Sequence, residues 1–230
     1  MNKTAYLTVM LVFFSAAGMA NAAGDPKAGE AKAELCFDCH GINGISEDNT
    51  FPKLAGQYED YIIKQIKRFK NGERNDDTMT DMAMMIETDQ DLEDIAAYFS
   101  SQPDMTGTPA QPPITVERKI RKRGESEKIV DVPIADLGKD LFLDASFTKC
   151  YECHGIDGRG KRYRSRGAPK LAGQHKAYLL KAMDDIRTNK RQADRFGLMK
   201  RGLISISEDE RGYIAEWLSG LGAEVEVTEQ

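Results

Sequence analysis

The chain has 230 residues, of which 40% are hydrophobic and 30% are charged, and its formal net charge is −5. This composition is that of an ordinary globular protein, and the length is enough for two small domains. A multispanning membrane protein is excluded, because no stretch after residue 22 is apolar enough to cross a bilayer.

Residues 1–22 are typical of a cleaved export signal. Lys3 provides a positive start, residues 5–17 are mostly apolar, and residues 20–22 read A-N-A, a cleavage pattern. The apolar run is shorter than the roughly 20 residues that a spanning helix needs. We therefore expect a mature chain that begins at Ala23 and has no transmembrane span. In a Gram-negative bacterium its compartment would be the periplasm.

A first helix is predicted from Asp25-Pro26, an N-cap followed by proline at the first helical position, and it leads into the sequence C-F-D-C-H at residues 36–40. The pattern returns as C-Y-E-C-H at residues 150–154. C-x-x-C-H is the attachment signature of a c-type haem, in which two thiols bind the haem covalently and the histidine binds iron. Two such haem motifs predict two covalently bound haem c groups. The predicted attachment residues are Cys36, Cys39, Cys150 and Cys153, and the predicted iron ligands are His40 and His154.

The same cysteines allow two other interpretations, a redox disulfide or a four-cysteine zinc site. A zinc site would have to join pairs that lie more than a hundred residues apart, whereas zinc ribbons usually place them about 15 to 20 apart. A disulfide motif would not need a histidine after each pair. The haem interpretation is therefore favoured.

The chain is an internal repeat. F-P-K-L-A-G-Q at residues 51–57 returns as A-P-K-L-A-G-Q at residues 168–174, and residues 95–99 correspond to residues 214–218. Each half shows helical periodicity without strand-like alternation, and its last helix is predicted to start at Thr88 or at Ser207. We predict an all-α fold of two tandem domains.

The predicted boundaries are a first domain at residues 23–103, a long linker at 104–136 and a second domain at 137–230. Prolines open the linker, and residues 114–116 and 129–132 could pair as a hairpin that turns near Gly124. Its basic run, R-K-I-R-K-R at residues 118–123, resembles a nucleic-acid patch in isolation. In an exported chain a solvated loop is the better interpretation, and we expect no nucleic-acid partner.

The second axial ligand of each iron must come from elsewhere. His175, the one remaining histidine, cannot serve two irons, and we interpret it as a surface residue. Methionine sulfur is the natural ligand and raises the reduction potential. Met199 lies seven residues before Ile206, as Met79 lies seven before Ile86. These spacings favour Met199 and Met79, with Met82 as the alternative in the first domain.

On these motifs the chain resembles the dihaem cytochrome c4 family, which has two class I cytochrome c domains in tandem. The resemblance implies that the ligand is the first methionine of an M-T-x-M segment, here Met79, and Met199 in the second domain. It also implies that the carbonyls of Pro52 and Pro169 accept hydrogen bonds from the two haem histidines, which orients the imidazoles. The haems would face one another across the domain interface.

The predicted function is single-electron transfer in the periplasm, between respiratory-chain donors and a terminal oxidase or reductase. With both axial positions filled, no iron is open to substrate, so we expect a carrier and not an enzyme. Lys and Arg number 8 against 17 Asp and Glu in residues 23–103, and 17 against 14 in residues 137–230. This asymmetry favours different redox protein partners for the two domains, an electron donor and an electron acceptor, free or membrane-bound.

Two other functions stay open at this point. The chain could be the dihaem subunit of a dehydrogenase, such as a flavocytochrome that oxidises sulfide. A dihaem peroxidase is a weaker hypothesis, because it needs an iron that can open and commonly another histidine ligand.

Overall fold

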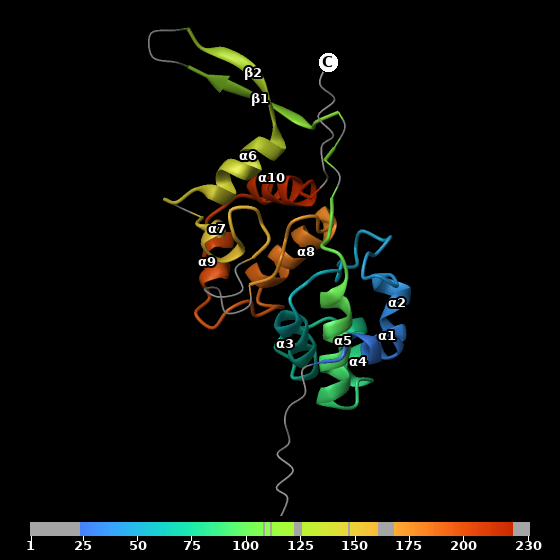
Figure 1. Cartoon of the computed structure of the whole chain (residues 1–230). Coiled ribbons are helices and arrows are strands. Elements are labelled where there is room, and N and C mark those ends of the chain that lie inside the picture. The colour runs from blue at the N-terminus through green and yellow to red at the C-terminus, as the bar shows by residue number, and fades with distance from the viewer. Residues whose placement is uncertain are drawn as a thin grey trace, which may run out of the picture.

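The fold is described from a computed structural model, which describes residues 24–107, 109–110, 112–121, 126–146, 148–160 and 168–222. The predicted export signal at residues 1–22 lies outside the described residues, as do residues 122–125 of the basic linker. The described chain forms two helical units that lie against each other, with a two-stranded hairpin between them in sequence (Figure 1). No helix among these residues is long and apolar enough to cross a membrane.

The first unit holds five helices: α1 (Pro26–Lys32), α2 (Glu34–His40), α3 (Glu59–Lys70), α4 (Asp77–Met84) and α5 (Asp89–Ser101). Two of their starts agree with the sequence signals. The Asp25 side chain accepts a hydrogen bond from the backbone of Lys27 at the start of α1, and Pro26 is the first helical residue. The Thr88 side chain accepts one from the backbone of Asp91 at the start of α5.

The second unit repeats this order: α6 (Ile134–Leu143), α7 (Cys150–His154), α8 (Lys176–Arg187), α9 (Leu198–Ile204) and α10 (Glu208–Ser219). A complete capping box between Ser207 and Glu210 starts α10, as the sequence predicts. Helix α6 begins at Ile134, inside the segment that we had assigned to the linker. It is the counterpart of α1.

The first and last helices of each unit cross closely because a glycine stands at each crossing. A Cβ at Gly29 of α1 would lie 2.0 Å from the carbonyl oxygen of Asp94 in α5. A Cβ at Gly138 of α6 would lie 1.9 Å from the carbonyl oxygen of Tyr213 in α10. Any side chain would force the helices apart, so these two glycines set the helix packing that frames each haem motif.

Each unit has its own apolar core. Phe99 and Leu92 of α5 are almost completely buried in the first, and Phe142 of α6 and Leu218 of α10 in the second. The first core consists of Ala33, Ile62, Ile86, Leu92, Ile95, Ala96, Tyr98 and Phe99. The second consists of Phe142, Leu179, Met183, Ile186, Leu203, Ile206, Ile214, Ala215 and Leu218.

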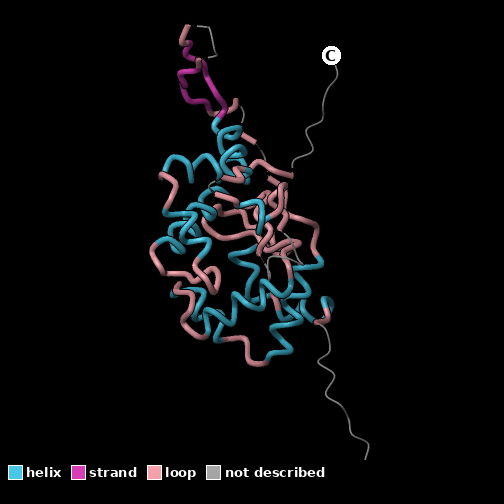
Figure 2. The backbone as a smooth tube through the Cα atoms, turned by 90° about the vertical axis from the view of Figure 1, so that its left-hand side faces the viewer, coloured by secondary structure: helices cyan, strands magenta, loops and turns pink. Residues whose placement is uncertain are grey.

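The linker contains the hairpin that the sequence suggested. Strands β1 (Thr115–Ile120) and β2 (Lys128–Pro133) pair antiparallel, with Val116 opposite Val132. The strands extend further than residues 114–116 and 129–132, because the basic residues 118 and 119 belong to β1. The hairpin projects from α6, away from the helical body (Figures 1 and 2).

Candidate haem sites

The two haem motifs occupy short helices whose histidines point into the protein. His40 and His154 are buried, and the Nδ1 atom of His40 lies 2.8 Å from the carbonyl oxygen of Pro52. The Nδ1 atom of His154 lies 3.2 Å from the carbonyl oxygen of Pro169. Such a bond holds the ring in one orientation and leaves Nε2 for a metal. Burial lowers the pKa of both histidines, although the carbonyls oppose the shift, so the neutral, ligating form is favoured.

None of the four cysteines, all of which the structure describes, is joined in a disulfide. Burial raises the pKa of the Cys36 thiol to about 11 and also raises that of Cys150, which disfavours the reactive thiolate. Among the described residues, which include all four cysteines, no group of three or more His, Cys, Asp or Glu side chains could hold a metal ion. The structure therefore offers no support for a four-cysteine zinc site.

A single cavity of about 1310 Å³ connects the two haem motifs. Its walls are predominantly apolar and include His40 and His154 together with methionines from both units. Met79, Met82, Met183 and Met199 line it. Met84 and Met85 do not, and they are 63% and 61% exposed. Methionines thus share the cavity with the histidines in both units, and Met82 remains beside Met79.

An aspartate fixes the backbone of each predicted methionine ligand. The carboxylate of Asp76 accepts a hydrogen bond from the backbone N–H of Met79 and caps α4. In the second unit, the carboxylate of Asp194 accepts hydrogen bonds from the backbone of Phe196, Leu198 and Met199, each at 2.9 Å. We predicted neither aspartate. Asp76 is the N-cap of α4, so the acid-before-helix pattern could have revealed it, whereas Asp194 lies three residues before Gly197, the N-cap position of α9, and gives no such signal.

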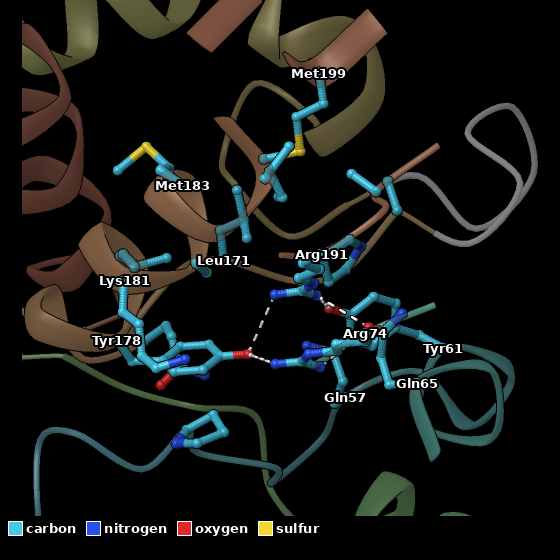
Figure 3. Close-up of a pocket in the computed structure, with 18 of the residues that line it drawn as sticks. Gln57, Tyr61, Gln65, Arg74, Leu171, Tyr178, Lys181, Met183, Arg191 and Met199 are labelled. Atoms are coloured by element: carbon cyan, nitrogen blue, oxygen red, sulfur yellow. Dashed lines mark hydrogen bonds between the residues drawn. The ribbon is translucent and has the colours of Figure 1, made fainter. Parts of the chain in front are cut away.

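Two arginines and a tyrosine form a cluster where the units meet, with Arg191 buried and the other two half-buried (Figure 3). The phenol oxygen of Tyr178 lies 3.1 Å from Nη2 of Arg74 and 3.5 Å from Nη1 of Arg191. Arg74 and Arg191 also pair as an isolated antiparallel bridge, which relates the units by an approximate twofold axis. Arg191 further donates to the Tyr61 hydroxyl. Burial opposes ionisation of Tyr178, but the two arginines outweigh it and lower its pKa to about 8.

This cluster fits an anionic group between the haem motifs. Arg74 and Arg191 both line the cavity, and Arg191 is only 7% exposed. Its Nε atom is buried and has no hydrogen-bond partner among the residues that the structure describes. A buried guanidinium with a free donor is costly unless an acceptor meets it, and the carboxylates of a haem would be such acceptors. The donor set and the apolar walls thus fit two haems that share one cavity.

The repeated K-L-A-G-Q segments join the two units reciprocally. The Gln174 side chain accepts from the backbone N–H of Lys53 and donates to its carbonyl, both at 2.9 Å. The Gln57 side chain makes the same pair of bonds with Lys170, both at 3.0 Å. We call these four bonds the glutamine clamp. Pro52 and Pro169 immediately precede the clamped lysines. In each domain, the same short segment therefore orients that domain's histidine and binds the other domain.

His175 belongs to this interface and is not free on the surface. It is half-buried, and its Nε2 lies 2.9 Å from the carbonyl oxygen of Ser46 in the first unit. Our interpretation as a surface residue was wrong because the surface of one unit becomes an interface when the other packs on it.

The chain matches known cytochromes along most of its length. The family model for cytochrome c matches it twice, at residues 27–103 and 135–222. Cytochrome c4 of Stutzerimonas stutzeri is 36% identical over 96% of this chain and all of its own length. Cytochrome c4 of Azotobacter vinelandii is 34% identical with the same coverage.

Solved structures agree with these relatives. The crystal structure of reduced recombinant cytochrome c4 from Pseudomonas stutzeri matches with a TM-score of 0.71 and 34% identity, over 86% of this chain and all of that one. Two family-model matches, one in each unit, imply one haem c in each. The chain belongs to the cytochrome c4 family, with two tandem cytochrome c domains and two covalently bound haem c groups.

Proposed function

We propose that each haem is bound through its C-x-x-C-H motif and that its iron has one histidine and one methionine ligand. His40 and Met79 serve the first iron, and His154 and Met199 serve the second. The observation that supports this proposal is that all four residues line the one cavity that contains both haem motifs. Cys36 and Cys39 attach the first haem, and Cys150 and Cys153 attach the second.

The haem supplies a one-electron couple between ferric and ferrous iron when it is bound. The residues of this chain tune that couple. The Pro52 and Pro169 carbonyls orient the histidines, the apolar walls exclude water, and thioether sulfur favours the ferrous state. Arg74 and Arg191 lie between the sites and stabilise negative charge there.

The function that this site supports best is transfer of single electrons between respiratory-chain donors and a terminal oxidase or reductase. The protein would act in the periplasm after removal of residues 1–22, with domains at 23–103 and 137–230. With both axial positions of each iron occupied, it would be a carrier rather than an enzyme. The cytochrome c4 relatives support the carrier function.

The experiment is haem stoichiometry with the visible spectrum of the exported protein, in wild type and in Met79→Ala and Met199→Ala. We expect two covalent haems and the weak far-red band of methionine sulfur on ferric iron, halved by each substitution. Met82→Ala is the matched control and should keep the full band. Protein without haem would refute the proposal, and a band lost in Met82→Ala instead of Met79→Ala would change the first ligand.

A second candidate is the electron acceptor of a sulfur-oxidising dehydrogenase. A relative named thiosulfate dehydrogenase electron acceptor, from Thiomonas intermedia, is 26% identical over 82% of this chain and 79% of its own length. Co-purification with a dehydrogenase subunit, and reduction by that enzyme with thiosulfate or sulfide, would favour this function over the respiratory one.

A further inference from the structure

The two aspartates that hold the predicted methionine ligands, Asp76 and Asp194, each follow a segment that lies against the other domain. Residues 73–75 lead to Asp76, and residues 190–193 lead to Asp194. We call these two stretches the approach segments. They meet antiparallel across the domain interface. A contact that holds an approach segment in place therefore also bears on the methionine that follows it.

Backbone hydrogen bonds join the approach segments on either side of the bridge between the two arginines. The N–H of Asn75 donates to the carbonyl of Lys190 at 3.0 Å. The N–H of Gln192 donates to the carbonyl of Glu73 at 3.2 Å. The segment that leads to each methionine is thus paired with the segment that leads to the other.

A buried arginine of the first domain reinforces the approach segment of the second. Arg68 of α3 is 9% exposed, and its Nη1 donates to the carbonyl of Ala193 at 3.2 Å and also to that of the residue before it. The Nε of the same guanidinium lies 3.3 Å from the carboxylate of Glu73. Ala193 immediately precedes Asp194. The first domain thus supplies a cation that fixes the segment leading to Met199.

A lysine of the second domain makes the reverse contact. The Nζ of Lys181 in α8 lies 3.4 Å from the carboxylate of Asp76, which caps the helix of Met79. It also lies 2.7 Å from the carboxylate of Asp185, one turn further along α8, and this contact holds the ammonium group within reach of Asp76. The position of Arg68 in α3 corresponds to that of Asp185 in α8. Because Asp185 is an acid, the second domain supplies its cation from Lys181 instead.

We infer that Arg68 and Lys181 are positioning residues that act across the domain interface, Arg68 on the Met199 ligand of the second haem and Lys181 on the Met79 ligand of the first. This inference rests on the axial ligands proposed above. Each iron holds its methionine partly through a residue of the domain that does not carry that iron. The packing of the two domains therefore controls how easily either methionine leaves.

The test measures how readily imidazole replaces methionine on the ferric holoprotein, followed as loss of the far-red band. Imidazole binds an iron only when the methionine is detached, so its apparent affinity rises by the same factor as the detached population. Met199→Ala leaves only the band of the first haem, and Met79→Ala leaves only that of the second. Each haem is therefore measured alone.

Arg68→Met keeps the long side chain and removes its donors. In the Met79→Ala background it should raise the apparent imidazole affinity of the second haem about tenfold or more, because a buried charged donor is lost. In the Met199→Ala background it should change the affinity of the first haem by at most about twofold, since only the ion pair with the half-exposed Glu73 is lost there. Arg68→Lys keeps the charge and one donor group, and it should recover part of the wild-type value at the second haem.

Lys181→Met should act in the opposite direction. The Lys181 side chain is 49% exposed and that of Asp76 32%, so the affinity of the first haem should rise about two- to fivefold, the range of a partly exposed ion pair. The second haem should change by less than about twofold. Lys176→Met is the matched control, because Lys176 lies on the same helix and its ion pair with Glu216, at 2.7 Å, stays within the second domain. It should leave the affinity of the first haem as in wild type.

Equal changes at both haems in Arg68→Met and in Lys181→Met would indicate a general loosening of the protein and would overturn the inference. An effect confined to the domain that carries the substitution would overturn it as well, and so would an effect of Lys176→Met on the first haem as large as that of Lys181→Met. A wild-type holoprotein without the far-red band would refute the proposed ligands instead.

Discussion

Removing the Asp194 carboxylate should release Met199, the proposed ligand of the second iron. This side chain organises the loop before α9, residues 194–197, because it accepts backbone hydrogen bonds from Phe196, Leu198 and Met199 at 2.9 Å each. In Asp194→Ala these three backbone N–H groups would have to bond to water instead, and the segment before Met199 would keep only weaker support such as the bond from Arg201 to the Phe196 carbonyl. Asp76 is the counterpart, with one such bond from Met79 at 3.1 Å.

The magnitude follows from the number of bonds. Asp194 does not cap α9, so the cost comes from its bonds to backbone N–H groups, and a hydrogen bond to a charged group is worth about 1.5–3 kcal/mol. Because the loop is half-exposed, water replaces some of the lost hydrogen bonds. We therefore expect the loop to lose about 2–4 kcal/mol of local stability. That raises the population with Met199 detached by about 30- to 1000-fold.

The assay follows the absorbance of the far-red band of the ferric protein as guanidinium is added at low concentrations. Asp194→Ala should lose half of the band's absorbance at a much lower guanidinium concentration than wild type does, while its helix content is still unchanged. Asp76→Ala should lose the other half of the band's absorbance at a guanidinium concentration closer to that of wild type. Equal shifts in the two variants, or an unchanged band in Asp194→Ala, would refute the idea that the number of carboxylate bonds controls how firmly the methionine is held.

The same carboxylate should make the stability of this loop depend on pH in the acid range. Burial opposes ionisation of Asp194, but the backbone donors and Arg201 outweigh it and lower its pKa. Stability from these bonds is therefore complete above the ordinary carboxyl pKa of about 3.9 and is lost as pH falls through the lower folded value. Asp194→Ala should lack this acid transition in the band.

Three further changes test the frame around the haem sites. Gln174→Ala leaves the buried N–H and carbonyl of Lys53 unpaired and should cost about 2–4 kcal/mol in denaturant unfolding, with faster proteolysis between the domains. Gly29→Ala places a methyl against the helix that carries Asp94 and should cost about 1–3 kcal/mol or more, seen as a lower melting temperature. Lys32 and a backbone N–H lower the pKa of Asp94 to about 2, so its contribution is full above about pH 3.9 and is lost towards pH 2. Asp94→Asn should cost roughly 1–3 kcal/mol at pH 7 and flatten that acid dependence in a pH series of unfolding curves.

Features encoded in short stretches of sequence were the predictable ones. The repeat and the helical periodicity predicted two helical units, and the signals at Thr88 and Ser207 mark the actual starts of α5 and α10. A cap or a C-x-x-C-H motif involves residues only a few positions apart, so the sequence contains the whole arrangement. The hairpin was predicted for the same reason.

Features formed by distant residues were missed. Arg74 and Tyr178 are 104 positions apart and meet only because the units pack about an approximate twofold axis. In sequence, Arg74 and Arg191 resemble solvated surface charges, and nothing in their neighbours indicates burial. The surface assignment of His175 failed for the same reason. The function of the repeated glutamines, Gln57 and Gln174, was hidden as well, since the motif could equally have served its own domain.

The glutamine clamp also has a consequence for motion. Lys53 adjoins the proline that contacts His40, and Lys170 adjoins the proline that contacts His154, so both histidines are tied to the same rigid joint. Rotation of one domain against the other would have to break the hydrogen bonds of the clamp. Passage of an electron inside the molecule then needs no hinge movement, and its rate should not depend on the viscosity of the solvent.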